Sequence, residues 1–196
     1  MPCENILTGA ILNDCANAMV GGIEVNVLLF NHADIDKSAC TFSATNNTLM
    51  TNFQLKAGKT GYLFEGVKQA NSLKSELVIK ENGINKHKHT FTGVILQFSA
   101  DNKERLMELA NGGKVAVMVE LKWKGAGNAE AFQLGGYESG LNLTSYNWAT
   151  NENDGTVQIE LSSEENYEEP KIPLTVLETD YTTTATAFGN KFAQAV

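Results

Sequence analysis

The sequence has few cysteines and prolines and no long hydrophobic run. Its three cysteines, Cys3, Cys15 and Cys40, are odd in number and lack C-x-x-C spacing, so they indicate neither a disulfide framework nor a zinc site. No segment approaches the ~18 consecutive apolar residues of a membrane helix. Residues 1–5 lack the basic region and apolar run of a secretory signal. We therefore expect a chain made in the cytoplasm, with no membrane contact, no metal and no cofactor.

The composition fits one globular domain over residues 1–196. With 42% hydrophobic residues, the chain is long enough to fill a single core. Three segments lack a clear pattern and are expected to be irregular. These are an N-terminal arm at 1–20, a long polar loop at 35–60 and a Thr- and Ala-rich C-terminal tail at 181–196.

The net charge of −8 is unevenly distributed along the chain. Residues 1–55 contain five acids and one base, residues 56–124 contain seven acids and twelve bases, and residues 125–196 contain eleven acids and two bases. Two interpretations stay open. The charges form solvated faces, or a basic face of one subunit meets an acidic face of the next. A chain of this net sign is not expected to bind DNA strongly.

Alternation of apolar and polar residues predicts a mainly β protein. The clearest case is Lys114 to Lys124, where Val115, Val117 and Val119 share one face. A long hairpin is expected where Glu81, Asn82 and Gly83 separate two such runs, because Asn-Gly suits a type I′ turn. The other expected strands cover 23–30, 62–67, 72–80, 86–98, 129–135, 141–150, 156–161 and 174–177.

One helix is expected, over about 101–111. Asp101 is a candidate N-cap, Leu106 and Leu109 form an apolar edge, and Gly112 follows the last turn. Together with the strands, this helix predicts a β-barrel or sandwich of long antiparallel strands with one packed α-helix.

The histidines offer weak candidates for a metal site. His87 and His89 are two residues apart on an expected strand, so their side chains share a face and two ligands would point the same way. They are flanked by lysines beside a turn, and we expect them to be exposed polar residues instead. His32 with Asp34 and Asp36 lacks the glycine and the distal glutamate of a calcium loop.

No catalytic signature is present in the sequence. There is no G-x-S-x-G, no G-x-x-x-x-G-K-[ST] and no G-x-G-x-x-G after a strand. Glu164, Glu165, Glu168 and Glu169 would supply paired carboxylates for glycoside hydrolysis, but consecutive acids in a polar loop are expected at the surface. We predict that the protein is not an enzyme.

Four aromatic residues are candidates for a carbohydrate-binding platform. They are Trp123, Trp148, Tyr137 and Tyr146. Trp123 lies on the valine-rich face of its strand and is expected in the core.

Four segments resemble a known protein family. They are Ile6 to Asn31, Ala100 to Leu121, Phe132 to Leu161, which contains "GLNLTS", and Glu168 to Pro173, which reads "EEPKIP". In their order of hairpin, helix, strand, glycine turn and hairpin, they resemble the tail tube (major tail) proteins of phages that infect Bacteroidetes-type bacteria. The resemblance covers most of the chain, and its motifs are turns and strands without a catalytic signature.

The resemblance implies a structural protein of the virion tail. Its subunits would form stacked hexameric rings, bind other tail proteins and conduct DNA through an acidic lumen without specific binding. Long strands with open edges give a separate reason to expect a ring, because ring closure pairs the edges. As assembly contacts we expect the turn Glu81, Asn82 and Gly83 and the acidic residues Glu164, Glu165, Glu168 and Glu169.

Two alternatives stay open. A tube protein of a contractile injection system would have the same architecture and conduct proteins. A β-sandwich module that binds carbohydrate or a host surface would instead present an exposed aromatic platform.

Overall fold

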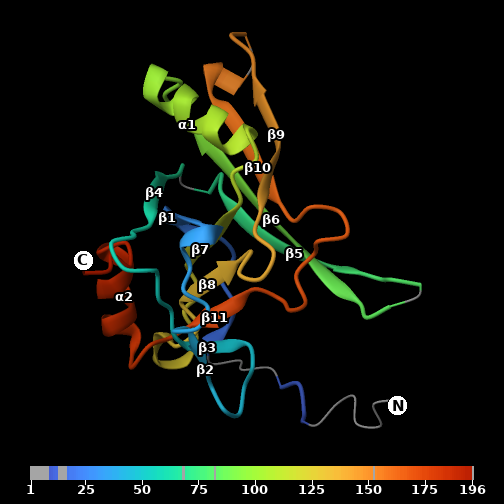
Figure 1. Ribbon diagram of the computed structural model, residues 1–196, viewed down its shortest axis with the longest axis vertical. Helices are drawn as coiled ribbons and strands as arrows, with labels where there is room; N and C mark the ends of the chain where they lie inside the picture. The colour runs from blue at the N-terminus through green and yellow to red at the C-terminus, as the bar shows by residue number, and fades with distance from the viewer. Residues whose placement is uncertain (1–8, 13–16, 68, 82, 152, 196) are drawn as a thin grey trace.

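The computed structural model describes residues 9–12, 17–67, 69–81, 83–151 and 153–195 (Figure 1). Over these residues the chain forms two β-sheets and two α-helices, which confirms the expected mainly β fold with a packed helix. No helix in these ranges is long and apolar enough to cross a membrane.

The larger sheet has seven strands and the smaller has four. The larger comprises β1 (Ile23–Asn31), β2 (Thr41–Phe42), β3 (Leu49–Asn52), β4 (Tyr62–Glu65), β7 (Val115–Leu121), β8 (Phe132–Gly135) and β11 (Leu174–Val176). The smaller comprises β5 (Ser72–Val78), β6 (Lys86–Ile95), β9 (Asn142–Trp148) and β10 (Val157–Ser162). The helices are α1 (Ala100–Ala110) and α2 (Tyr181–Gly189).

The strand order shows which segments depend on one another. The larger sheet follows β2-β3-β11-β8-β7-β1-β4, and the smaller follows β5-β6-β10-β9. All pairings are antiparallel except the one between β11 and β3. In this order, β2 and β3 connect to the rest of the sheet only through β11.

Strand β7 lies at the centre of the core and is buried on both faces. Val117 and Val119 pack with Phe91 of the smaller sheet. Met118 faces the other way, into a cluster that includes Phe132 and residues of α2. The smaller sheet therefore covers one face of β7, and α2 with the region around β3 covers the other. Burial of each large apolar side chain here contributes about 2 kcal/mol.

Helix α1 is confirmed, but its N-cap is Ser99 and not the expected Asp101. Ser99 Oγ accepts a hydrogen bond from the backbone N–H of Asn102 at 3.2 Å, which satisfies one of the free donors in the first turn. Leu106 is buried with residues of β10. The helix ends before Gly112, whose φ of 96° suits glycine.

Residues 35–60 are a loop only in part. Strands β2 and β3 pair within this range, and Met50, Phe53 and Leu55 are buried. The pattern is weak in the sequence because Met50 and Phe53 are three residues apart, which breaks strict alternation, and because β2 has only two residues.

The expected N-terminal arm is described only at residues 9–12 and 17–20. These residues are exposed, and the carbonyl of Asn17 accepts a hydrogen bond from Trp123 Nε1 at 2.9 Å. Residues 1–8 and 13–16 lie outside the described residues, so the arm stays a prediction.

The expected C-terminal tail is wrong, because residues 181–189 form α2 and pack on the larger sheet. Asp180 caps the helix by accepting a hydrogen bond from Thr183 N at 2.7 Å. Phe188 is buried, with its ring 5.1 Å from that of Phe132. Threonine and alanine give no strong signal for an anchored helix. Contacts with distant aromatic residues, not local propensity, fix this segment.

We predict that Phe188→Ala lowers the free energy of unfolding by about 3 kcal/mol, because it opens a cavity between α2 and the sheet. Urea denaturation followed by circular dichroism measures the change. The matched control is Thr182→Ala on the exposed side of α2, expected to stay within about 0.5 kcal/mol of the wild type. Equal stability of both variants would show that the segment is not anchored.

Candidate assembly surface

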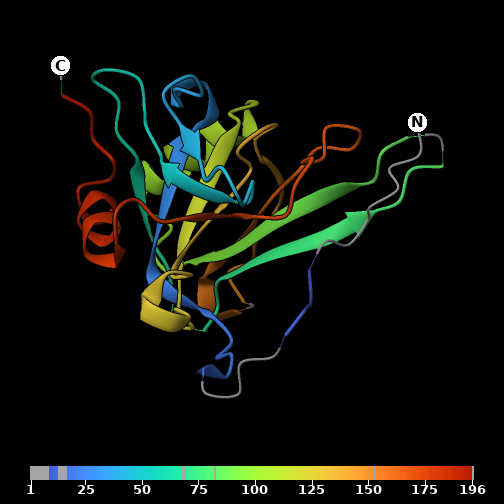
Figure 2. The same cartoon turned by 90° about the horizontal axis from the view of Figure 1, so that it is seen from below.

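The hairpin of β5 and β6 extends beyond the body of the molecule (Figure 2). Strand pairing ends where Val78 faces Lys86, so residues 79–85 connect the two strands. The long hairpin is confirmed, and strand pairing ends at Val78 and Lys86, several residues from the turn expected at Glu81, Asn82 and Gly83, which stays a prediction. Asn82 itself lies outside the described residues.

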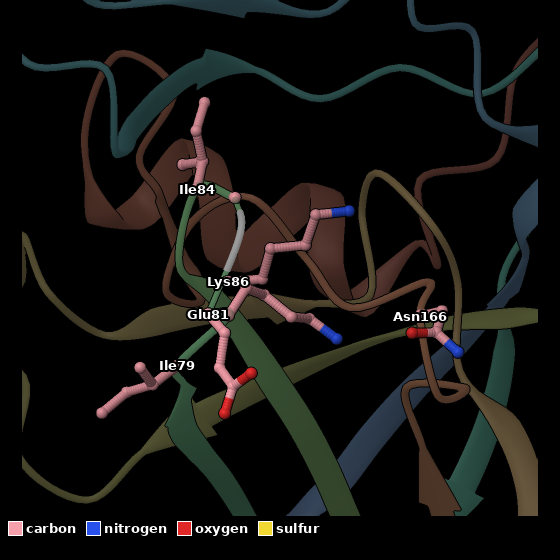
Figure 3. Close-up of a pocket in the computed structure, with 7 residues that line it drawn as sticks. Ile79, Glu81, Ile84, Lys86 and Asn166 are labelled. Atoms are coloured by element: carbon pink, nitrogen blue, oxygen red, sulfur yellow. The ribbon is translucent and has the colours of Figure 1, made fainter.

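The end of the hairpin and a neighbouring loop line an open hollow of about 640 Å³ (Figure 3). Its lining residues are Ile79, Lys80, Glu81, Gly83, Ile84, Lys86 and Asn166. Ile79 is 74% exposed and Ile84 is 88% exposed. Asn166 belongs to the loop after β10, so the structure brings together the two segments expected to make assembly contacts. Two exposed isoleucines thus lie on the projecting hairpin.

Glu169 is buried beside the hairpin, so the expectation that it lies at the surface is wrong. Its carboxylate accepts hydrogen bonds from the backbone N–H groups of Glu138 at 2.9 Å and Ser139 at 2.8 Å. Its own backbone exchanges two hydrogen bonds with His87 of β6, at 2.8 and 2.9 Å. Burial raises the pKa of Glu169, and the two N–H donors partly oppose this rise. Glu169 thus ties the end of β6 next to the 79–85 connection to the loop after β8.

Glu168 is also buried, and it binds Lys80 near the end of the hairpin. The Lys80 Nζ to Glu168 Oε1 distance is 2.9 Å. The hydrogen bond from Lys80 lowers the pKa of Glu168. The other two acids are exposed as expected. Glu164 forms an ion pair with Lys114 at 3.2 Å, and Glu165 lies at the surface.

His89 is buried, which contradicts the expectation of an exposed histidine. Only 2% of it is accessible. Its Nδ1 accepts a hydrogen bond from the backbone N–H of Gly136 at 3.2 Å, and its Nε2 has no hydrogen bond of ordinary geometry. Burial lowers the pKa of His89 to about 4, partly opposed by the carbonyl of Lys171. A neutral imidazole therefore links β6 to the turn after β8, and His87, which is partly exposed, does not share this role.

The other histidine candidate is also tied to the backbone. His32 Nε2 lies 3.0 Å from the carbonyl oxygen of Tyr137. Burial is the main cause that lowers the pKa of His32. In the part of the chain that the structure describes, no three His, Cys, Asp or Glu side chains are placed to share a metal ion.

The outer face of the smaller sheet is polar. Ile159 and Leu161 of β10 point into the core, so Gln158 and Glu160 point outward. Thr92 of β6 lies opposite Glu160 on the same face. Gln158 is exposed, and β5 and β9 are the two outermost strands of this sheet. The sheet thus combines one apolar face, one polar face and two edges.

The four candidate aromatic residues do not form one platform. Tyr137 is buried, and Trp123 lies beyond the end of β7. Tyr146 and Trp148 of β9 are 57% and 43% exposed. Lys103 of α1 lies over the Trp148 ring, with its Nζ 5.8 Å from the ring centroid. Sequence patterns do not indicate this pairing, because it depends on how α1 packs on β9.

We predict that His89 makes stability depend on pH between about 6.5 and 4. In this window the unfolded chain takes up a proton at His89 that the folded chain excludes, so the free energy of unfolding falls as the pH falls, by about 3 kcal/mol in total. The raised pKa of Glu169 acts in the opposite sense, because there the folded chain takes up the proton first.

Urea denaturation at pH 7 and pH 5 measures this dependence. His89→Asn keeps an acceptor for Gly136 N–H and removes the titrating group. It is expected to lose less stability than the wild type on acidification. The same loss in both proteins would rule out a titrating role for His89.

Comparison with known proteins does not identify a family. No protein-family model matches this sequence, and the search of curated proteins found no match. We therefore infer function from the geometry of the described residues.

Proposed function

We propose that the protein is the subunit of a phage tail tube, in which hexameric rings stack into a conduit for DNA ejection. The observation that carries this proposal is the smaller sheet, with its polar outer face and its outermost strands β5 and β9. Within the described chain, no strand pairs with the outer edge of either one. Open sheet edges bind further strands, so such a sheet favours assembly.

The directions of the two edge strands suit ring closure. Each neighbouring pair in the order β5-β6-β10-β9 is antiparallel, so β5 and β9 run in opposite directions. When a second copy is rotated about a common axis, its β9 can lie antiparallel beside β5 of the first. Repetition of this contact closes the sheets into one barrel and leaves no edge unpaired.

The polar face would then line the bore. In the body of the sheet it presents Thr92, Gln158 and Glu160, which are hydroxyl, amide and carboxylate groups. Lys74, further out on the same sheet, is paired with Glu76 at 2.8 Å. Lys86 and Lys88 of β6 lie on the same face nearer the hairpin loop, whereas the part around Thr92, Gln158 and Glu160 carries no lysine or arginine among the described residues, so DNA that passes this part would meet no cation.

Two other functions are weaker proposals. A tube of a contractile injection system would use the same ring and conduct proteins, and a sheath gene beside this one would favour it. A carbohydrate-binding module is favoured only by the exposed pair Tyr146 and Trp148. Loss of glycan binding in Trp148→Ala, with no assembly of the wild type, would support the module.

We predict that the purified protein forms rings or tubes with a central hole in negative-stain electron microscopy. A labelling experiment tests whether the polar face lines that hole. Single cysteines are introduced by Gln158→Cys on the outer face of β10 and by Thr182→Cys on α2, in a chain carrying Cys3→Ser, Cys15→Ser and Cys40→Ala. In tubes, a small maleimide should react at both positions, whereas a maleimide on a bulky polymer should react only at position 182.

The free subunit is the control for this experiment, because both reagents should react at both positions in it. Equal access of the bulky reagent to position 158 in tubes would place the polar face outside. Monomers at every concentration, also with other tail proteins added, would contradict the tube.

A further inference from the structure

The loop between β8 and β9 is held by ionisable side chains from distant parts of the chain. We call residues 136–140 of this loop the clamp loop. His89 Nδ1 accepts a hydrogen bond from the backbone N–H of Gly136 at 3.2 Å. The Glu169 carboxylate accepts hydrogen bonds from the N–H groups of Glu138 at 2.9 Å and Ser139 at 2.8 Å. Three backbone donors of the clamp loop therefore depend on two side chains that can gain or lose a proton.

The carbonyl groups of the clamp loop contact a different part of the molecule. His32 Nε2 lies 3.0 Å from the carbonyl oxygen of Tyr137, whose side chain is buried and anchors the loop. Lys37 Nζ donates a hydrogen bond to the carbonyl of Glu138 at 2.9 Å. His32 and Lys37 follow β1 of the larger sheet, whereas His89 belongs to β6 of the smaller sheet. The clamp loop thus joins segments of both sheets.

Glycines at the two ends of the clamp loop let it move between fixed points. Gly136 has a φ of 74° and Gly140 a φ of 78°. A Cβ atom would lie 2.7 Å from Leu141 Cγ at the first position and 3.0 Å from Lys114 Cβ at the second, so both require glycine. Next to the loop, Leu141 exchanges backbone hydrogen bonds with Val115 at 2.7 and 2.9 Å. The strand ends are therefore held, and the hinges lie inside them.

The two buried side chains respond to pH in opposite senses. His89 and Glu169 are each 2% accessible. Because a charge is costly to remove from water, burial favours the neutral form of each group. The neutral imidazole lacks the extra proton, whereas the neutral carboxyl group holds one. Opening of the clamp loop would expose both groups to water, so acid favours opening through His89 and closure through Glu169.

Nearby charged groups leave these signs unchanged. His87 of β6 disfavours a proton on His89, which adds to the effect of burial. Burial is the main cause that raises the pKa of Glu169; the charge of Glu138 raises it further and that of Lys37 lowers it, and these two groups form an ion pair with each other at 3.1 Å. The other polar neighbours of His89 are uncharged groups, namely Ser75 of β5, Ser163 after β10 and the carbonyl of Lys171.

We propose that the clamp loop opens as one local unit, and that between neutral and mildly acidic pH Glu169 offsets the acid-driven opening that His89 would cause alone. The joint between the two sheets then varies less with pH than it would with either group by itself. This proposal concerns an opening that needs less free energy than unfolding of the whole subunit. It stands independently of the tube function.

Two single substitutions separate the opposing groups. The reference chain carries His32→Gln, because His32 is also partly buried and would titrate, and a glutamine amide can donate to the Tyr137 carbonyl. In this chain, Glu169→Gln leaves His89 as the titrating group that accepts from the clamp loop, and His89→Asn leaves Glu169. Both substitutions keep an acceptor for backbone N–H groups. Glu165→Gln, an exposed acid of the neighbouring loop, is the matched control.

Hydrogen exchange at the backbone amides of Gly136 and Ser139, corrected for the intrinsic effect of pH, measures the ratio of open to closed loop. With Glu169→Gln this ratio should rise about twentyfold from pH 7 to pH 5, because the open loop takes up a proton at His89 that the closed loop excludes. With His89→Asn the ratio should fall over the same range. The reference chain should lie between the two variants, and the control should match the reference.

The amides of β7 report on unfolding of the whole subunit in the same experiment. Clamp-loop amides that exchange no faster than those of β7 at every pH would overturn the proposal, because the loop would then open only with the whole fold. A pH dependence of the same sign in both variants would also overturn it. Rings or tubes are not needed for any of these outcomes, so failure here leaves the tube function standing.

A titration of the wild-type subunit by NMR gives the same test if a variant fails to fold. The imidazole of His89 should take up its proton below the ordinary pKa of histidine, and the carboxyl group of Glu169 should take up its proton above that of glutamate. Shifts in these directions support the opposing roles. A pKa of His89 at or above its ordinary value, or of Glu169 at or below its own, would overturn the proposal.

Discussion

The burial of β7 on both faces is the constraint on which the rest of the structure depends. A strand in this position needs a layer on each side, and the smaller sheet and α2 supply them. Because the smaller sheet uses its apolar face to cover β7, its other face turns to solvent and is polar. The surface proposed as the bore is thus a consequence of how the core is filled.

A second set of contacts holds the hairpin in its projecting position. Glu169 joins β6 to backbone N–H groups after β8, and His89 does the same through Gly136. Both groups are buried, so the loss of either would leave an unpaired polar partner in the interior. Lys80 and Glu168 extend this support toward the end of the hairpin. The part of the hairpin near its connecting loop is therefore held against the body of the molecule, which in the proposed tube would fix the direction in which it reaches a neighbour.

The sequence predicted those elements that are determined by residues close together in the chain. The strand at 114–124, the long hairpin and the helix near 101–111 follow from alternation, turn residues and an apolar edge, and the structure confirms each with small changes of boundary. The sites of Glu169, His89 and α2 depend on partners far away in the chain. No pattern around residue 169 indicates that the N–H groups of Glu138 and Ser139 will face it. Likewise, the exposure of Trp148 is set by the packing of α1.

The place of β11 in the larger sheet also bears on when the protein can fold. The hairpin of β2 and β3 joins the sheet only through β11, which comes more than a hundred residues later in the chain. Contacts so distant in sequence form slowly, because a long loop has to be closed before they contribute. During synthesis the hairpin of β2 and β3 can therefore join the sheet only after β11 has been made. The larger sheet is therefore complete only after nearly the whole chain has left the ribosome, which in the proposed tube would delay formation of the finished subunit until synthesis is almost over.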